Sequence, residues 1–162
     1  MKLEIFRVKL GLNSCYLIRG KDVVMIDGGM PKKLKVFKRV LKRLDINPSD
    51  IKLIVLTHSH FDHSGSAKEI REFTGAKIAI HESERTYLEN GGMIIPKGVN
   101  IYGKITKPLL FAIFKKISFP KFKPDILITE EPYSLKAYGI DGNIINTPGH
   151  TFGSISVILD SG

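Results

Sequence analysis

The chain has 162 residues, of which 43% are hydrophobic, and a formal net charge of +9. This composition is typical of a globular domain and excludes a disordered chain. The single cysteine, Cys15, excludes an intrachain disulfide and is expected to pack inside a strand. No apolar stretch reaches the roughly 18 residues of a membrane span, and the N-terminus begins as an alternating strand rather than a secretory signal. We therefore expect a cytoplasmic protein with one domain over residues 1–162.

The first fifty residues are predicted to form three strands and one amphipathic helix. Strands at 3–10 and 14–19 are expected to pair as a hairpin through residues 11–13, and an apolar strand follows at 23–26. Pro31 fits the first turn of a helix, and Asn47 with Pro48 ends it. Apolar residues at helical spacing give this helix one buried face: Leu34, Phe37, Val40, Leu41 and Leu44.

From residue 51 onward strands and helices alternate, which is typical of an α/β fold. The predicted elements are strand 51–57, helix 64–73, strand 77–80, helix 82–90, and strands 126–129, 134–138, 143–146 and 154–159. Glycines mark the ends of both helices, at Gly75 and Gly91. Residues 91–124 interrupt the pattern as a basic and apolar insertion. They contain seven lysines and no acidic residue, and so carry most of the net charge.

Four side chains that can bind metal occupy six positions directly after the apolar strand 51–57. The segment reads Thr57-His58-Ser59-His60-Phe61-Asp62-His63. In extended backbone, residues i and i+2 point to the same side, so His58 and His60 can reach one ion. Asp62 and His63 follow as the chain turns and can face a second ion. His150, in a Pro-Gly turn after another apolar run, can complete a three-histidine face that leaves a position open for water.

Each of these residues taken alone has a plainer interpretation. A lone histidine is more often a core, capping or surface residue, and Asp62 alone would serve as the N-cap of helix 64–73. However, three of the five histidines fall within six residues, which favours a metal site. His81 is isolated at another strand end, so we expect it to support the structure or a ligand rather than bind metal.

Two motifs carry a resemblance to a known family. They are Thr57-His58-Ser59-His60-Phe61-Asp62-His63-Ser64-Gly65 and Thr147-Pro148-Gly149-His150-Thr151-Phe152-Gly153-Ser154. With segments 13–18 and 23–29 they resemble, in order, the metallo-β-lactamase superfamily of metallohydrolases, over nearly the whole chain. The resemblance implies an α/β fold, a four-layer αββα sandwich with a dinuclear, usually zinc, site at one edge. The resemblance implies that this chain contains largely the N-terminal part of that sandwich.

The resemblance also implies ligands. His58, His60 and His150 would bind the first metal, and Asp62 and His63 the second. Asp62 would also orient the attacking water as the catalytic residue. His60 favours the hydrolytic zinc branch, because the oxygen-reducing di-iron relatives carry a carboxylate there. Iron or manganese would also accept these side chains.

The chain departs from the family pattern at its C-terminal end. Family members place a metal-bridging Asp after the hairpin that follows the Gly-His turn, and a further His later still. We expect Asp160 to belong to the hairpin turn rather than to the metal site. The resemblance therefore predicts a piece of a longer protein, or a second site that is incomplete without another chain.

The implied function is hydrolysis of a small-molecule ester, thioester, lactone or phosphoester by a metal-bound hydroxide. A nuclease acting on RNA or DNA is one alternative, although the basic insertion contains no arginine. A metal-binding domain without turnover is another.

We expect a small-molecule substrate, anionic with an apolar part, in preference to nucleic acid or a membrane surface. The insertion 91–124 is predicted to form a lid whose lysines and apolar residues select such a substrate. Alternatively, its apolar stretch packs on the core or on a partner subunit, and a homo-oligomer is compatible with the sequence.

Overall fold

The computed structural model describes residues 3–91 and 121–160. Its α-helices and strands follow one another in this order: β1 (Glu4–Lys9), β2 (Ser14–Arg19), β3 (Val23–Ile26), α1 (Leu34–Leu44), β4 (Ile51–Val55), α2 (Phe61–Ser64), α3 (Ala67–Thr74), β5 (Lys77–His81), α4 (Arg85–Asn90), β6 (Ile126–Ile128), β7 (Tyr133–Ser134), β8 (Gly142–Asn146) and β9 (Ile155–Leu159). Short 3-10 helices lie at Pro48–Asp50, Glu82–Glu84 and Lys136–Tyr138.

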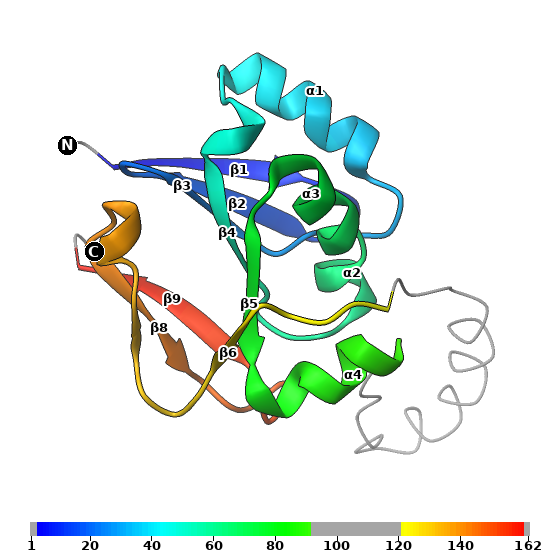
Figure 1. Ribbon diagram of the computed structural model, residues 1–162, viewed down its shortest axis with the longest axis vertical. Helices are drawn as coiled ribbons and strands as arrows, with labels where there is room; N and C mark the ends of the chain where they lie inside the picture. Colours follow the sequence, from blue (N-terminus) through cyan, green and yellow to red (C-terminus); the bar gives the residue numbers. More distant parts are fainter. Residues whose placement is uncertain (1–2, 92–120, 161–162) are drawn as a thin grey trace.

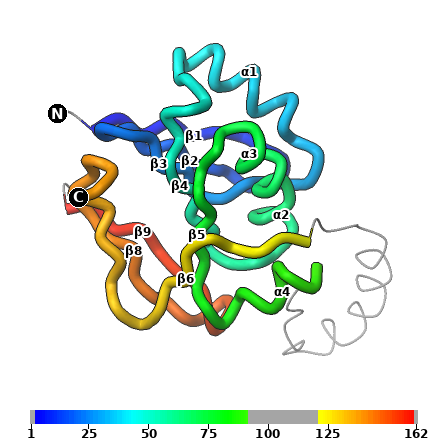
Figure 2. The backbone as a smooth tube through the Cα atoms, in the orientation of Figure 1, coloured from blue at the N-terminus to red at the C-terminus, as the bar shows by residue number. Residues whose placement is uncertain are grey.

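The strands form two sheets. The larger sheet has the order β1-β2-β3-β4-β5-β6, in which β1 to β3 pair antiparallel and β3 to β6 pair parallel. The smaller sheet is the antiparallel set β7-β8-β9. In Figure 1, α1 and α3 lie on one side of the larger sheet, and β8 and β9 lie on the other side. The backbone trace in Figure 2 shows the C-terminal hairpin as a layer of its own.

Both faces of the central strands of the larger sheet are buried, and alternate residues of these strands enter different cores, whereas Ile5 of β1 and Tyr16 of β2 are exposed. In β3, Val23 and Met25 belong to the core on the helix side, whereas Val24 and Ile26 belong to the core between the two sheets. This explains the run of four buried residues in β3, because a strand covered on both faces has no solvent side.

The helix-side core confirms the amphipathic prediction for α1. Phe37 and Leu41 are buried there with Ile70 of α3, and Leu34 and Val40 pack against the edge of the same cluster. The exposed face of α1 carries the basic residues. Hydrophobic burial of this stripe fixes α1 on the sheet.

The start of α1 differs from the prediction. Lys32 has a φ of 63°, in the left-handed region, so the chain cannot be helical there and α1 begins at Leu34 rather than at Pro31. The helix ends at Leu44, where Asp45 adopts a left-handed conformation with a φ of 51°. Asn47 instead accepts a hydrogen bond from the Ser49 N–H and so caps the following 3-10 helix.

The predicted helix 64–73 corresponds to α3, which begins at Ala67, and a separate short helix, α2, precedes it at Phe61–Ser64. Ser66 lies between them, and its hydroxyl donates to the Met30 carbonyl (2.6 Å) and accepts from the Lys33 N–H (2.8 Å). Asp62 consequently lies inside α2 and is not an N-cap, since His60 occupies the N-cap position. The predicted helix 82–90 is likewise a 3-10 turn followed by α4.

The predicted strand 134–138 is wrong beyond Ser134. The side chain of Leu135 is fully buried in the core between the sheets, and its N–H donates to the Gly142 carbonyl. The chain then closes a 3-10 turn that ends at Gly139, whose φ is 71°. The buried Leu135 side chain is thus placed by a turn and not by a strand.

The predicted lid lies outside the described residues, apart from Gly91 and residues 121–124. Within the described ranges the layers are helices, the larger sheet and the smaller sheet, and no α-helix there covers the outer face of the smaller sheet. No helix among the same residues is long and apolar enough to cross a membrane.

Phe37 tests the helix-side core. Replacing it with Ala should lower the free energy of unfolding by about 3–5 kcal/mol, because the fully buried ring leaves a cavity under α1. The exposed neighbour Lys42 provides the control, since Lys42→Ala should change that free energy by less than about 0.5 kcal/mol. Urea denaturation of both variants measures the difference, and equal stabilities would contradict the packing of α1.

Candidate metal centre

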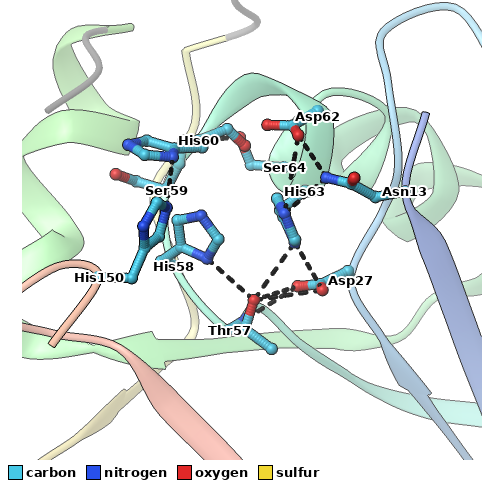
Figure 3. A network of polar contacts seen from close by, with 10 residues as sticks. All are labelled: Asn13, Asp27, Thr57, His58, Ser59, His60, Asp62, His63, Ser64 and His150. Carbon is cyan, nitrogen blue, oxygen red and sulfur yellow. Dashed lines mark hydrogen bonds and ion pairs between the residues drawn. The ribbon is translucent and has the colours of Figure 1, made fainter. Parts of the chain in front are cut away.

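The predicted ligands gather at one edge of the sandwich, and they arrive from two sheets. The loop after β4 carries His58 and His60, the first turn of α2 carries Asp62 and His63, and the loop between β8 and β9 carries His150. Figure 3 shows the side chains of all five converging on a common region. A backbone hydrogen bond from the Ile155 N–H to the Thr57 carbonyl (3.0 Å) joins the two loops.

Three of the imidazoles form a compact cluster. One ring nitrogen each from His58, His60 and His150 lies within 4.8 Å of the other two. The ring centroids are 4.5 to 4.9 Å apart, in edge-on arrangements. His150 Nε2 lies 3.2 Å from His60 Nδ1. Two nitrogen ligands of a tetrahedral zinc ion, each at about 2.0–2.1 Å, are separated by about 3.3 Å, so this spacing suits a metal.

The electrostatics of His58 also suit a metal ligand. Burial, together with the neighbouring His63, His60 and His150 rings, lowers the pKa of His58 to about 3, so its imidazole is neutral at pH 7. The Thr57 hydroxyl donates to Asp27 (3.0 Å), which leaves its oxygen free to accept from His58 Nδ1 (3.0 Å). This assigns the lone pair to Nε2, which is buried and has no hydrogen-bond partner among the described residues. A buried orphan acceptor is costly unless a cation or proton occupies its lone pair.

Asp62 and His63 form a second group beside the first. The rings of His58 and His63 have centroids 4.2 Å apart, and His63 Nε2 lies 3.7 Å from Asp62 Oδ2. The amide of Asn13 donates to Asp62 and lies 2.7 Å from His63 Nε2. The structure thus brings together the residues predicted for the second metal, and it adds Asn13 between them.

Asp27 organises this region and was not predicted as a site residue, because Asp27-Gly28-Gly29 taken alone is typical of a turn. The carboxylate is 5% exposed and accepts from the Thr57 N–H (2.9 Å) and hydroxyl, and from His63 Nδ1 (2.8 Å). Its own N–H donates to the Val55 carbonyl at the end of β4. The signal available in the sequence was an acidic residue directly after a buried strand.

The pKa of His63 reflects this partner. Burial lowers it, but the hydrogen bond and charge of Asp27, with the charge of Asp62, outweigh burial and raise the pKa above the ordinary 6.5. Asp27 therefore holds the His63 ring in one orientation and keeps Nε2 directed at Asp62.

The remaining candidates lie apart from the cluster. His81 Nδ1 accepts from the Ser83 N–H at the start of a 3-10 helix and is not among the three clustered imidazoles. Burial and the charge of Asp27 raise the pKa of Cys15 to about 12, so this thiol is no thiolate ligand at neutral pH. Asp160 continues the hairpin pairing, because its N–H donates to the Asp141 carbonyl.

Comparison with known proteins decides the family. The sequence model of the metallo-beta-lactamase superfamily matches residues 8–162. The chain belongs to the metallo-β-lactamase superfamily. The resemblance and the α/β sandwich predicted from the sequence are therefore confirmed.

Relatives of this superfamily member include several hydrolases. It is 35% identical to a probable metallo-hydrolase of Methanocaldococcus jannaschii over 149 residues, which are 92% of this chain and 63% of that protein. It is 28% identical to a hydroxyacylglutathione hydrolase of Haemophilus influenzae, over 98% of this chain and 66% of that protein. The chain thus spans somewhat less than two thirds of the length of these relatives.

Solved structures show the same fold. A subclass B3 metallo-β-lactamase of Bradyrhizobium japonicum superposes with a TM-score of 0.66 and 28% identity, over 90% of this chain and 50% of that one. A mutant metallo-β-lactamase of Cronobacter sakazakii gives a TM-score of 0.73 at 22% identity, over 98% and 57% of the two chains.

The pKa of His63 tests the role of Asp27. In metal-free protein, Asp27→Asn should lower this pKa, since the charge that stabilises the imidazolium is removed. Because the folded pKa is raised, protonated His63 stabilises the wild type below about pH 6.5, and this contribution is lost as pH rises through the folded value. NMR titration of the His63 ring measures the pKa. Asp50→Asn, at the opposite end of β4, should leave it unchanged, and an unchanged pKa in Asp27→Asn would contradict the pairing.

Proposed function

We propose that the chain contributes the zinc site of a metal-dependent hydrolase, with His58, His60 and His150 as ligands of one zinc ion. The observation that carries this proposal is the three-imidazole cluster, in which a neutral, buried His58 has an Nε2 without a hydrogen-bond partner in the described part of the chain, beside two other ring nitrogens. Membership of a superfamily of metallohydrolases supports it.

A second metal is proposed at Asp62 and His63, which makes the centre dinuclear. Zinc bound in such a centre polarises a substrate carbonyl or phosphoryl group and acidifies a water molecule. The chain's own contribution is orientation: Asp27 holds His63, and Asn13 holds the Asp62 carboxylate. Asp62 keeps 23% of its side chain exposed, so it can accept a hydrogen bond or proton from an entering water molecule.

Thioesters are the substrates to examine first. The hydroxyacylglutathione hydrolase of H. influenzae aligns with nearly the whole chain, and the substrate in its name is a thioester. Esters, lactones and phosphoesters remain within the proposed class. The exposed position of His150 leaves the cluster open to a small molecule from solvent. We also propose an anionic substrate with an apolar part and a cytoplasmic location for the protein.

Zinc content tests the metal site. His58→Ala, His60→Ala and His150→Ala should each abolish tight zinc binding, because three protein ligands are the usual minimum for a catalytic zinc site. His81→Ala, which removes a histidine that belongs to neither proposed metal position, should retain the wild-type zinc content. Elemental analysis after equilibration with zinc and gel filtration gives the stoichiometry. Wild-type zinc content in all three cluster variants would refute the assignment.

Hydrolysis tests the activity separately. The zinc-loaded chain should hydrolyse a hydroxyacylglutathione thioester, lose this activity in a chelator and regain it when zinc is restored. Asp62→Asn should reduce kcat/KM by about 10²-fold or more, since the residue that orients and deprotonates water is lost. A chain that binds zinc but cleaves none of the four bond classes would refute the hydrolase and leave the metal site standing.

A further inference from the structure

A buried carboxylate outside the ligand set touches the loop that carries two of the imidazoles. Glu84 is 0% exposed and lies in the 3-10 helix after β5. One of its oxygens, Oε2, accepts two hydrogen bonds from Ser59, from the N–H at 3.0 Å and from the hydroxyl at 2.5 Å. Ser59 lies between His58 and His60 in the chain, as Figure 3 shows. Glu84 therefore fixes both the backbone and the side chain of the residue that joins two proposed ligands.

The same side chain also touches the loop that carries the third imidazole. Gly153 lies three residues after His150, and a Cβ added to it would lie 2.6 Å from Glu84 Cγ. The loop can approach Glu84 this closely only because residue 153 has no side chain. Glu84 thus contacts the β4 loop by hydrogen bonds and the β8–β9 loop by packing, and these are the two loops that must meet to form the cluster.

The charge of Glu84 is incompletely balanced. Burial of a carboxylate costs free energy unless hydrogen bonds or an opposite charge compensate. Among the described residues no lysine, arginine or histidine forms an ion pair with Glu84, and its Oε1 has no hydrogen-bond partner there. A divalent cation bound by the imidazoles on either side of Ser59 would supply the opposite charge nearby.

We propose that Glu84 is a positioning residue of the metal centre, which holds the His58–His60 loop through Ser59, seats the His150 loop at Gly153 and favours a cation in the cluster by its buried negative charge. This inference rests on the proposed metal site. It predicts that Glu84 matters more to metal affinity than to folding of the metal-free chain.

The test compares Glu84→Gln with Glu82→Gln. Both variants lose one carboxylate from the same 3-10 helix, but Glu82 is exposed. Titration with Co²⁺, followed by its visible absorption, gives metal affinity and coordination geometry, and thermal unfolding in a chelator gives metal-free stability. Glu84→Gln should bind Co²⁺ about 10–100-fold more weakly, with an altered absorption band. The Tm of the metal-free variant should stay within a few degrees of the wild-type Tm, because a change of about 1 kcal/mol in the free energy of unfolding shifts Tm by only that much. Glu82→Gln should match the wild type in every measurement.

The outcomes separate three cases. If Glu84→Gln lowers metal-free stability but binds Co²⁺ with wild-type affinity and spectrum, Glu84 is only structural and the inference is overturned. If the wild type itself takes up no Co²⁺, the proposed metal site fails and this inference fails with it. If Glu84→Gln does not fold, Ser59→Ala decides, because it removes the hydroxyl donor and leaves Glu84 in place. Weaker Co²⁺ binding by Ser59→Ala supports the inference, and unchanged binding overturns it.

Discussion

The hydrogen bonds of one buried carboxylate, Asp27, hold together the segments that carry the proposed ligands after β4. Asp27 lies where β3 ends, receives hydrogen bonds from Thr57 where β4 ends, and orients His63 on α2. The end of β3 and the segment Thr57–His63, which begins 30 residues later, are therefore joined through one acceptor group. Its left-handed backbone, with a φ of 60°, lets the chain turn immediately after β3 and still aim the carboxylate back at the next strand. Because Asp27 is 5% exposed, water competes little for these hydrogen bonds.

The two cores explain why this network is rigid enough to orient ligands. Alternate side chains of β3 and β4 enter the helix-side core and the core between the sheets, so both central strands are held from two sides. The residues that follow these strands consequently emerge from a fixed platform. The small sheet contributes through the same packing: Ile144 and Ile155 are buried against the large sheet, and His150 lies in the loop between their strands. Packing of apolar residues thus determines where the third imidazole arrives.

Much of the fold follows from local patterns in the sequence, and the departures have identifiable causes. Strands Ser14–Arg19 and Val23–Ile26 were predicted to the residue, because alternation and apolar runs are local signals. The break between α2 and α3 was not predictable, since Ser66 bonds to Met30 and Lys33, which are distant in the sequence. The same applies to the site. Candidate ligands such as His58 and His60 could be predicted because they lie close together in the sequence. The roles of Asp27, Asn13 and Glu84 could not, because they depend on contacts between segments that are distant in the sequence.

The origin of the three imidazoles has a consequence for folding. Two come from the large sheet and one from the small sheet, and His60 and His150 are 90 residues apart in the chain. An ion held by all three would act as a crosslink between the layers, closing a long loop much as a disulfide does. The affinity for the ion would then depend on how stably the two sheets pack together, and the stability of that packing would depend on the bound ion. A substitution that loosens the sheet interface far from the edge would release the ion more readily, and depletion of the ion would make the small sheet the first layer to detach.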